Sequence, residues 1–378
     1  MNSGLSPSDP VLVAAFRSAL LHQGAIALVM VVFLGLVGAT ARVWRAGPPA
    51  GIAATAQNPE PRGRWLLRTG FGVLWIFDGL LQAQPKMAGG LATQVIAPVA
   101  ASSPAWVRHL VNWGGTIWSY HPVQAGAASV WIQVGIGAWL IAAGRGAWSR
   151  LPAAASVAWG LIVWVFGEAF GGIFAPGLSW LTGAPGGVLY YVVAGALIAL
   201  PEDTWRSPRF GRWLLAGLGG FLAGMAVLQA WPGRGSWQGT VLGNTVVGNT
   251  VVGNTVLGNT VLGNTGLGKP GPLAGMVREM AATPQPHVLS SLLSGFASFV
   301  TRHGFAVNLV VVLALAGLGA LFLTGRPRLV RPAVWAGIGF CLATWVLVQD
   351  LGFLGGLGTD PNSMIPLILL FSAGYLAL

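Results

Sequence analysis

The chain has 378 residues, of which 54% are hydrophobic and only 8% are charged, whereas about 25% of the residues of a typical soluble domain are charged. This composition excludes an ordinary soluble protein and predicts an all-α, polytopic membrane protein. The formal net charge is +11 at pH 7, and a single cysteine, Cys341, excludes an internal disulfide and a metal cage of cysteine thiolates.

Nine apolar segments follow one another along the chain, separated by proline, glycine and arginine. They cover residues 24–41, 66–84, 124–143, 154–175, 186–200, 213–231, 305–324, 333–353 and 364–378. A helix needs about 20 apolar residues to cross a bilayer. We therefore expect about nine transmembrane helices.

Uncommon residues recur in the same order in the two halves of the chain. The matching pairs are residues 64–67 with 212–215 (both Arg-Trp-Leu-Leu), 81–83 with 228–230 (both Leu-Gln-Ala) and 164–165 with 345–346 (both Trp-Val). We predict an N-terminal helix and cytoplasmic linker (1–63), a first four-helix half (64–201) and a second four-helix half (202–378). Because four is even, both halves enter the membrane in the same direction, as parallel repeats.

The segment 238–267 carries a repeat of Gly-Asn-Thr-Val followed by Val or Leu. Its five-residue period resembles that of pentapeptide-repeat proteins, which coil into a β-solenoid. A solenoid needs several stacked coils to bury a core, and this segment supplies few. We expect an external loop that grew by repeat expansion, and a small partner-contacting coil is the alternative.

Arginine residues are concentrated in alternate loops. These loops carry Arg42, Arg45, Arg62, Arg64 and Arg68, then Arg145 and Arg150, then Arg206, Arg209 and Arg212, then Arg326, Arg328 and Arg331. Because cytoplasmic loops retain basic residues, we expect a multi-pass protein of the plasma (inner) membrane. Its N-terminus would lie outside and its C-terminus in the cytoplasm. The arginines lie beside helix ends and form no basic domain, so no nucleic-acid partner is expected.

Two stretches resemble the DoxX/DoxD-like family of membrane proteins. The first runs Leu67-Arg68-x-Gly70-x-Gly72 and continues with Asp78-Gly79 and Lys86-Met87; the second runs Gln133-Val134-Gly135-x-Gly137-Ala138-x-Leu140, with Arg145 and Arg150 after it. The resemblance implies a four-helix membrane bundle, used twice here, with a quinone- or thiol/sulfur-linked redox function and a quinone as its cofactor. In that family a Glu commonly precedes the glycine pair, and Gln133 stands there instead.

Ionisable groups inside the bilayer are costly and mark functional sites. We consider Asp78, Glu168 and His121 as catalytic candidates. The ligand-binding candidates are Gln133, Trp164, Asp350 and His303. In the expected orientation they share the outer part of the membrane, which predicts an outward-facing polar cavity. No His lies three or four residues from a second ligand on one helix, so no metal site is expected.

Each half ends with a passage broken by glycine and proline before a short final segment. These passages are Gly171–Gly187 and Gly352–Pro361. Interrupted segments at matching positions of two repeats indicate a binding site. Close helix packing by the glycines is the alternative explanation.

Three functions remain open at this level. The first is a quinone- or sulfur-linked redox protein, and the second is a proton-coupled transporter of small molecules that uses the same acids. The third is a non-catalytic scaffold that binds membrane or envelope proteins through residues 233–303. The residues do not decide whether the protein is an enzyme.

Overall fold

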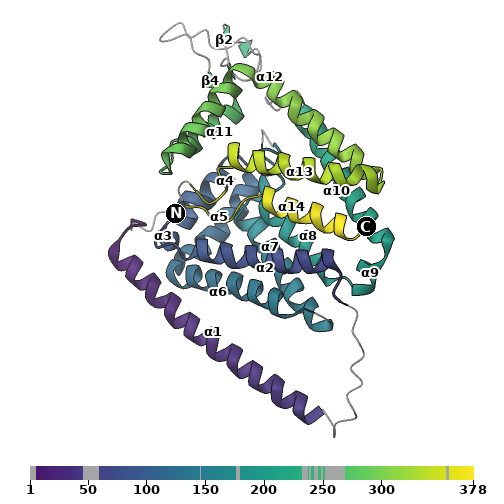
Figure 1. The fold of residues 1–378 in the computed structure, drawn as a ribbon. Helices are drawn as coiled ribbons and strands as arrows, with labels where there is room; N and C mark the ends of the chain where they lie inside the picture. Colours follow the sequence, from purple (N-terminus) through teal and green to yellow (C-terminus); the bar gives the residue numbers. More distant parts are fainter. Residues whose placement is uncertain are drawn as a thin grey trace.

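The structure is a computed structural model, drawn as a ribbon in Figure 1. It describes residues 6–45, 59–144, 146–175, 179–231, 237, 240–241, 246–247, 250–251, 269–354 and 357–378. Most of the repeat segment 238–267 and of the linker that ends at residue 63 lies outside the described residues, as does Arg145.

The described chain is almost entirely helical. The helices of the first half and the segment before it are α1 (Pro10–Arg45), α2 (Arg62–Gln82), α3 (Met87–Gly90), η1 (Leu91–Ile96), α4 (Ala97–Ala101), α5 (Ala105–Tyr120), α6 (Pro122–Ala142), η2 (Ala147–Ser149), α7 (Arg150–Phe166), η3 (Phe170–Gly172) and α8 (Gly187–Ala199). The second half contains α9 (Glu202–Arg206), α10 (Pro208–Ala230), α11 (Pro272–Ala281), α12 (His287–Leu323), α13 (Pro327–Leu347) and α14 (Met364–Leu376).

Four strands of two residues each lie between α10 and α11. β1 (Thr240–Val241) pairs antiparallel with β4 (Lys269–Pro270), and β2 (Val246–Val247) pairs antiparallel with β3 (Thr250–Val251). The predicted all-α class is therefore confirmed for the described residues, with only these short pairings as additions.

Each of the nine expected segments contains a helix, but the helices differ in length. Five described helices are long and apolar enough to cross a membrane: Pro10–Val37, Pro122–Ala142, Pro208–Ala230, His287–Leu323 and Pro327–Leu347. The helices α8 and α14 have 13 residues each, which corresponds to about 20 Å at 1.5 Å per residue. Both begin within one residue of the short segments expected from the sequence, 186–200 and 364–378, and passages that contain glycine and proline precede them.

Proline sets the beginning of most long helices. α6, α10 and α13 each begin with a proline at the first helical position. Proline suits this position because its φ is already helical and the N–H it lacks would have no partner there. The helix boundaries are therefore local properties of the sequence.

The helices pair in the same way in both halves. α2 packs along α6 and α7 against α8 in the first half, while α10 packs along α12 and α13 against α14 in the second. Both long pairs meet at glycine. A Cβ on Gly72 would lie 2.9 Å from the carbonyl oxygen of Gly137, and a Cβ on Gly219 would lie 2.8 Å from that of Gly319. Small residues let two backbones approach closely inside a membrane.

The two halves share one core. α14 of the second half packs against α2 and α8 of the first, and the indole of Trp180 stacks on Phe340 with ring centroids 5.1 Å apart. Helix α1 stands apart along most of its length (Figure 1). Its first half is anchored to α6, where Phe16 is buried and the Trp131 indole donates to the Leu20 carbonyl at 2.9 Å.

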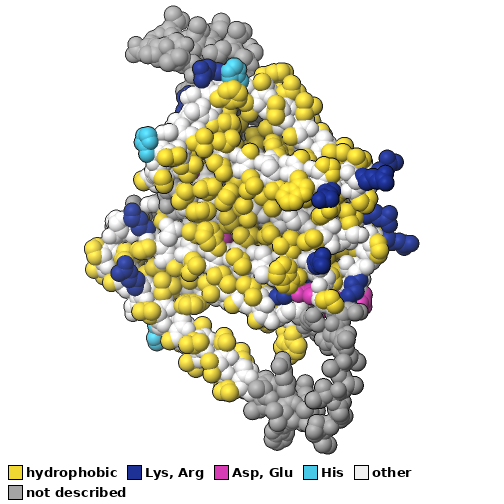
Figure 2. All heavy atoms as spheres, in the orientation of Figure 1, with side chains coloured by type: hydrophobic (Ala, Val, Ile, Leu, Met, Phe, Trp, Pro, Cys, Tyr) yellow, Lys and Arg dark blue, Asp and Glu magenta, His cyan; other side chains and the backbone are white. Residues whose placement is uncertain are grey.

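The surface is strongly apolar (Figure 2). On α1, Leu28, Val31 and Phe33 are each more than 60% exposed. Most of the Lys and Arg side chains in this view lie at the end of the bundle that carries α9 and the C-terminus. Apolar side chains of this kind are stable in contact with lipid tails, so this is the surface of a lipid-embedded protein.

Candidate functional site

A cavity of about 310 Å³ lies among α2, η1, α5, α6 and α7. Its lining includes the apolar side chains Leu91, Val95, Ile96, Ile117, Ile162, Val163 and Val188, and the aromatic side chains Trp75, Trp113, Trp118, Trp159 and Phe166. Its polar side chains are Asp78, Gln82, Ser129, Gln133, Glu168, Thr359 and Asp360. An apolar cavity with a few polar groups is typical of a small-molecule site.

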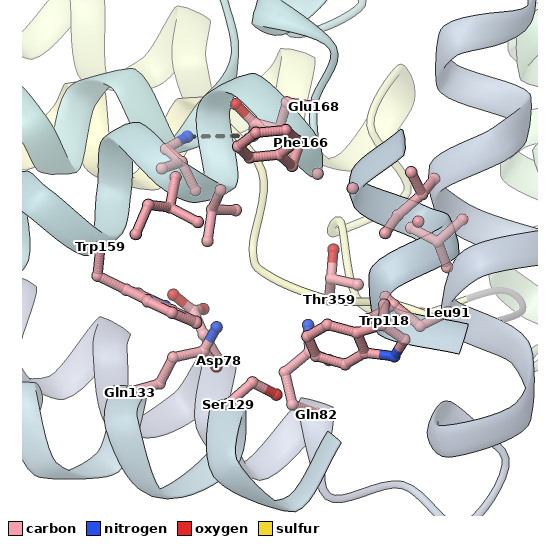
Figure 3. A pocket seen from close by; sticks show the side chains of 18 of the residues that line it. Asp78, Gln82, Leu91, Trp118, Ser129, Gln133, Trp159, Phe166, Glu168 and Thr359 are labelled. Atoms are coloured by element: carbon pink, nitrogen blue, oxygen red, sulfur yellow. Dashed lines mark hydrogen bonds between the residues drawn. The ribbon is translucent and has the colours of Figure 1, made fainter. Parts of the chain in front are cut away.

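One wall carries two pairs of polar side chains from two helices. Asp78 and Gln82 are four residues apart on α2, and Ser129 and Gln133 are four residues apart on α6, so each pair shares one helix face. The helices meet between the pairs, since a Cβ on Gly79 would lie 3.0 Å from the Val130 carbonyl oxygen. Figure 3 shows the four side chains grouped on this wall.

The carboxyl of Asp78 is the most deeply placed of these groups. Asp78 is only 2% exposed, and neither carboxyl oxygen has a hydrogen-bond partner among the described residues. The Tyr191 hydroxyl of α8 interacts with this carboxyl but lies outside hydrogen-bond geometry. Burying a polar group without a hydrogen-bond partner costs free energy, so a proton or a ligand that enters the cavity would stabilise this carboxyl.

Glu168 lies across the cavity from that wall (Figure 3). Helix α7 ends at Phe166, and Ala169, Phe170 and Gly171 all have positive φ. This turn directs Glu168 toward the start of α8, where its Oε1 accepts the Val188 N–H at 3.1 Å. The first N–H groups of a helix lack partners within it and favour a carboxylate. Oε2 has no partner among the described residues.

Close contacts hold the Glu168 turn in place. A Cβ on Gly171 would overlap the carbonyl of Pro185, and Gly171 has φ +60°. The Trp164 indole donates to the same carbonyl at 2.8 Å. Only glycine fits this position, because both the close approach and the left-handed backbone exclude a side chain.

The second half contributes the remaining acid. Asp360 lies in the loop between α13 and α14, where Oδ1 accepts the Asn362 N–H at 2.6 Å and Oδ2 accepts the Thr359 hydroxyl at 2.9 Å. The Gln84 amide holds this loop to the first half by donating to the Gly358 carbonyl at 3.0 Å. The halves therefore build the cavity together.

Glu168 and Asp360 face each other across Gly187. A Cβ on Gly187 would lie 3.4 Å from Oε1 of Glu168 and 3.5 Å from Oδ1 of Asp360. With Asp78, three carboxyl groups border one cavity, and no Lys, Arg or His side chain is among its lining residues. Like charges in a weakly polar space repel, so the cavity requires protons or a cation to balance them.

Hydrogen-bond donors also face the cavity. The indole N–H groups of Trp118 and Trp159 have no partner among the described residues, although both rings line the cavity. The indole of Trp75 is different, because it donates to the Ser156 hydroxyl at 2.8 Å. The cavity thus offers both carboxyl groups and free N–H donors to a ligand.

The structure brings together three of the seven site residues named from the sequence. Asp78, Glu168 and Gln133 line the cavity, and Trp164 supports it from behind through its bond to Pro185. His121 is exposed between α5 and α6.

The other two candidates belong to the second half. His303 lies at a kink in α12, is exposed and packs on Phe299. Asp350 is buried in the turn after α13 with φ +49°, and it does not line the cavity.

The second half repeats the geometry of the Glu168 turn without its acid. The Trp345 indole donates to the Pro361 carbonyl at 2.8 Å, as Trp164 does to Pro185. Gln349 takes the place of Glu168 and donates to the Ser363 hydroxyl at 2.9 Å. The equivalence follows from the chain, because Trp345 precedes Gln349 by the four residues that separate Trp164 from Glu168.

The remaining equivalents in the second half are apolar or already paired. Met225 occupies the position of Asp78 in the repeated segment. Gln229, the equivalent of Gln82, accepts from the Ser179 hydroxyl at 2.8 Å and donates to the Asn308 side chain at 2.7 Å. Gln229 is therefore already hydrogen-bonded, whereas the Oε1 of Gln349 and the carboxyl of Asp350 have no partner among the described residues.

Sequence reasoning did not select several residues of this cavity. The spacing of four between Asp78 and Gln82, and between Ser129 and Gln133, was a signal for two shared helix faces. No sequence signal places Asp360 or Thr359 beside Glu168, because they come from the other half of the chain.

Among the described residues, no group of three or more His, Cys, Asp and Glu side chains is arranged to hold a metal ion. Comparison of the chain with protein families, curated proteins and solved structures finds no match in any of the three. The DoxX-like resemblance therefore remains a prediction from short motifs.

Proposed function

We propose that this protein is a proton-coupled transporter of small molecules, with the cavity as its substrate site. One observation carries the proposal: three carboxyl groups border a half-open, largely apolar cavity that no basic side chain lines. Such carboxyl groups exchange protons with a substrate or with the medium when their surroundings change. The same acids would have no purpose in a protein that serves only as a scaffold.

The proposal includes the nine-span arrangement of two parallel four-helix repeats after one leading helix. The matching helix pairs α2 with α6 and α10 with α12 support it. α8 and α14 would reach through the membrane together with the irregular loops before them. Sites between repeats, built on interrupted helices, are common in transporters.

The proposal also places the N-terminus outside, the C-terminus in the cytoplasm and the protein in the plasma (inner) membrane. The concentration of basic side chains at the end that carries α9 and the C-terminus supports this orientation. Glu168 follows the end of α7, whose beginning carries Arg150. The cavity would therefore lie in the outer half of the membrane.

In the proposed cycle, Asp78 and Glu168 hold protons when no substrate is bound. Substrate displaces these protons as it enters between the two walls. The Trp164 bond and the Gly171 contact keep the Glu168 turn in one geometry. The exchange of protons against substrate couples the movement of the two.

The test is proton release in liposomes that contain the full chain and a pH-sensitive dye. Compounds of a small-molecule library are added to these liposomes. A compound that the wild type transports should cause a proton movement that the dye reports, and Asp78→Asn and Glu168→Gln should abolish this dye signal. Asp203→Asn, an exposed acid at the other end of the bundle, should behave as wild type. Wild-type activity of both cavity variants would refute the proposal.

A quinone-linked redox function is the second candidate. The free indole N–H groups of Trp118 and Trp159 and the amide of Gln133 favour it, because quinone carbonyl oxygens accept such hydrogen bonds. In this case the purified protein would carry a quinone or bind one in the same cavity. Extraction of a purified sample followed by chromatography decides between the two candidates.

A further inference from the structure

Aromatic rings form a large part of the cavity wall. Four of the chain's 18 tryptophans line it, together with Phe166. Aromatic faces attract cations because of the ring quadrupole, and the attraction is strongest for tryptophan and in a desolvated site. We propose that the ligand is a hydrophobic organic cation, an amine or quaternary ammonium with apolar substituents; this rests on the proposed function and names its substrate class.

The ring of Trp75 is held at a defined angle. Its indole donates to the Ser156 hydroxyl at 2.8 Å, and its ring meets Tyr191 edge-on with centroids 4.7 Å apart. Both contacts prevent rotation of the ring. Trp75 is therefore a rigid wall, one turn of α2 before Asp78.

Helix α5 lines the opposite side of the cavity. A Cβ on Gly114 would lie 2.5 Å from the ring of Phe166, and the ring centroids of Trp113 and Phe166 are 6.0 Å apart. This close packing brings Trp113 and Trp118 of α5 to the cavity beside α7. The cavity is open on this side, where Trp113 is 59% exposed, and buried at its other end, where Trp75 is 1% exposed. A cation–π interaction is stronger at the buried end.

Two of the three carboxyl groups of the cavity are placed to face one bulky cation. Asp78 and Glu168 lie on opposite walls, as Figure 3 shows, so a cation between them would contact carboxyl groups from two sides. The nearest guanidinium groups along α2, those of Arg64 and Arg68, are bound to Glu60 at the other end of the helix. They do not compete for the cavity acids.

The size and polarity of the cavity separate this class from other ligands. A volume of about 310 Å³ lies at the low end of small-molecule sites and suits one or two rings. A bare metal ion would leave the aromatic walls unused, and its oxygen ligands do not converge among the described residues. A neutral ligand would leave the balance of these carboxyl groups to protons alone.

The stoichiometry should be one cation per chain. At the equivalent positions of the second half, Met225 replaces Asp78 and Gln349 replaces Glu168. Gln229 is bound to Ser179 and Asn308, and Gln349 to Ser363. The second half therefore lacks acids at the positions of Asp78 and Glu168; its buried carboxyl, that of Asp350, does not line the cavity.

The probe for the test is benzyltrimethylammonium, titrated by calorimetry into the full chain in lipid nanodiscs. We expect one bound cation per chain. Trp159→Leu and Glu168→Gln should each weaken binding about tenfold or more, because each removes an interaction worth about one factor of ten in affinity. The control is Trp213→Leu, which alters a tryptophan of α10 that is 75% exposed and should bind as the wild type does.

The uncharged isostere neopentylbenzene completes the design, together with circular dichroism to verify that each variant is folded. Equal affinity for the isostere, or cation binding that neither folded cavity variant weakens, would overturn the inference. A quinone that binds in the cavity and resists displacement by the cation would also overturn it.

The proton-release assay in liposomes, combined with the cation titration in nanodiscs, distinguishes this inference from the proposed function. Cation binding without coupled proton movement would refute transport and leave the ligand class standing. Proton-coupled uptake of a neutral compound, without cation binding, would refute the ligand class and leave transport standing.

Discussion

Glu60 is the centre of a buried ionic cluster at the start of α2, and its replacement by alanine should destabilise the protein strongly. Its Oε1 accepts from Arg64 at 2.5 Å and from Arg68 at 3.1 Å, and its Oε2 accepts from Arg68 at 2.9 Å. The guanidinium groups also bind the end of α6. Arg68 donates to the carbonyls of Leu140 and Ile141, each at 2.7 Å.

The exposure of these side chains sets the magnitude. Those of Glu60, Arg64 and Arg68 are 8%, 2% and 7% exposed. Removing one partner of a buried ion pair leaves an uncompensated charge, which costs about 3–5 kcal/mol. Glu202→Ala is the matched control, because Glu202 and Arg206 are 22% and 35% exposed and an exposed pair contributes about 0–1 kcal/mol.

The assay is unfolding of the full chain in mixed micelles with increasing SDS, followed by tryptophan fluorescence. Glu60→Ala should lose several times more unfolding free energy than Glu202→Ala. Adding Arg68→Gln should recover part of the loss, because one uncompensated charge is removed. Equal losses in the two single variants, or a loss of less than about 1 kcal/mol for Glu60→Ala, would show that water reaches the cluster and would refute the reasoning.

Three further predictions concern the turn, the topology and the repeat. Gly171→Ala should lower stability and ligand binding, because the new Cβ would overlap the Pro185 carbonyl. Gly172→Ala is the control, since Gly172 has φ +72° and no atom lies within 4 Å of the new Cβ. It should lower the unfolding free energy by only about 1–2 kcal/mol in the same unfolding assay. A similar loss in both would show that the overlap is relieved. In intact cells, an impermeant maleimide should label Tyr120→Cys but not Trp148→Cys, both well exposed in the structure, while the buried Cys341 stays unlabelled; the reverse pattern would invert the proposed orientation. Deleting residues 238–267 should leave expression and cation binding unchanged, because the cavity lining lies outside this segment; loss of the folded protein in chromatography would contradict this.

Much of the fold could be predicted from local features of the sequence. Apolar segments located the five helices that are long enough to cross a membrane, because the cost of placing polar groups in lipid acts on each segment by itself. The amphipathic α5 (Ala105–Tyr120) lies outside these segments. Prolines such as Pro122 and Pro208 marked helix beginnings through their own backbone geometry. Recurring tryptophan, arginine and glutamine residues indicated the repeat, and the helix pairing has the same pattern.

The end of α7 was not predicted correctly from the apolar pattern. The apolar segment 154–175 suggested one long span, but α7 ends at Phe166. The turn after it depends on the contact between Gly171 and Pro185, which are distant in sequence. Hydropathy does not record such a contact, so it could not place the helix end.

Of the site, the sequence by itself determined which groups are costly in a membrane, and Asp78 and Glu168 were found for that reason. Only the tertiary structure decided which of them meet. His121 and His303 are as unusual in their segments as Asp78, yet they are exposed, while Asp360 reaches Glu168 from the other half of the chain. The cost of a polar group depends on its own segment, whereas a binding site depends on distances between segments, and these are set only when the helices pack.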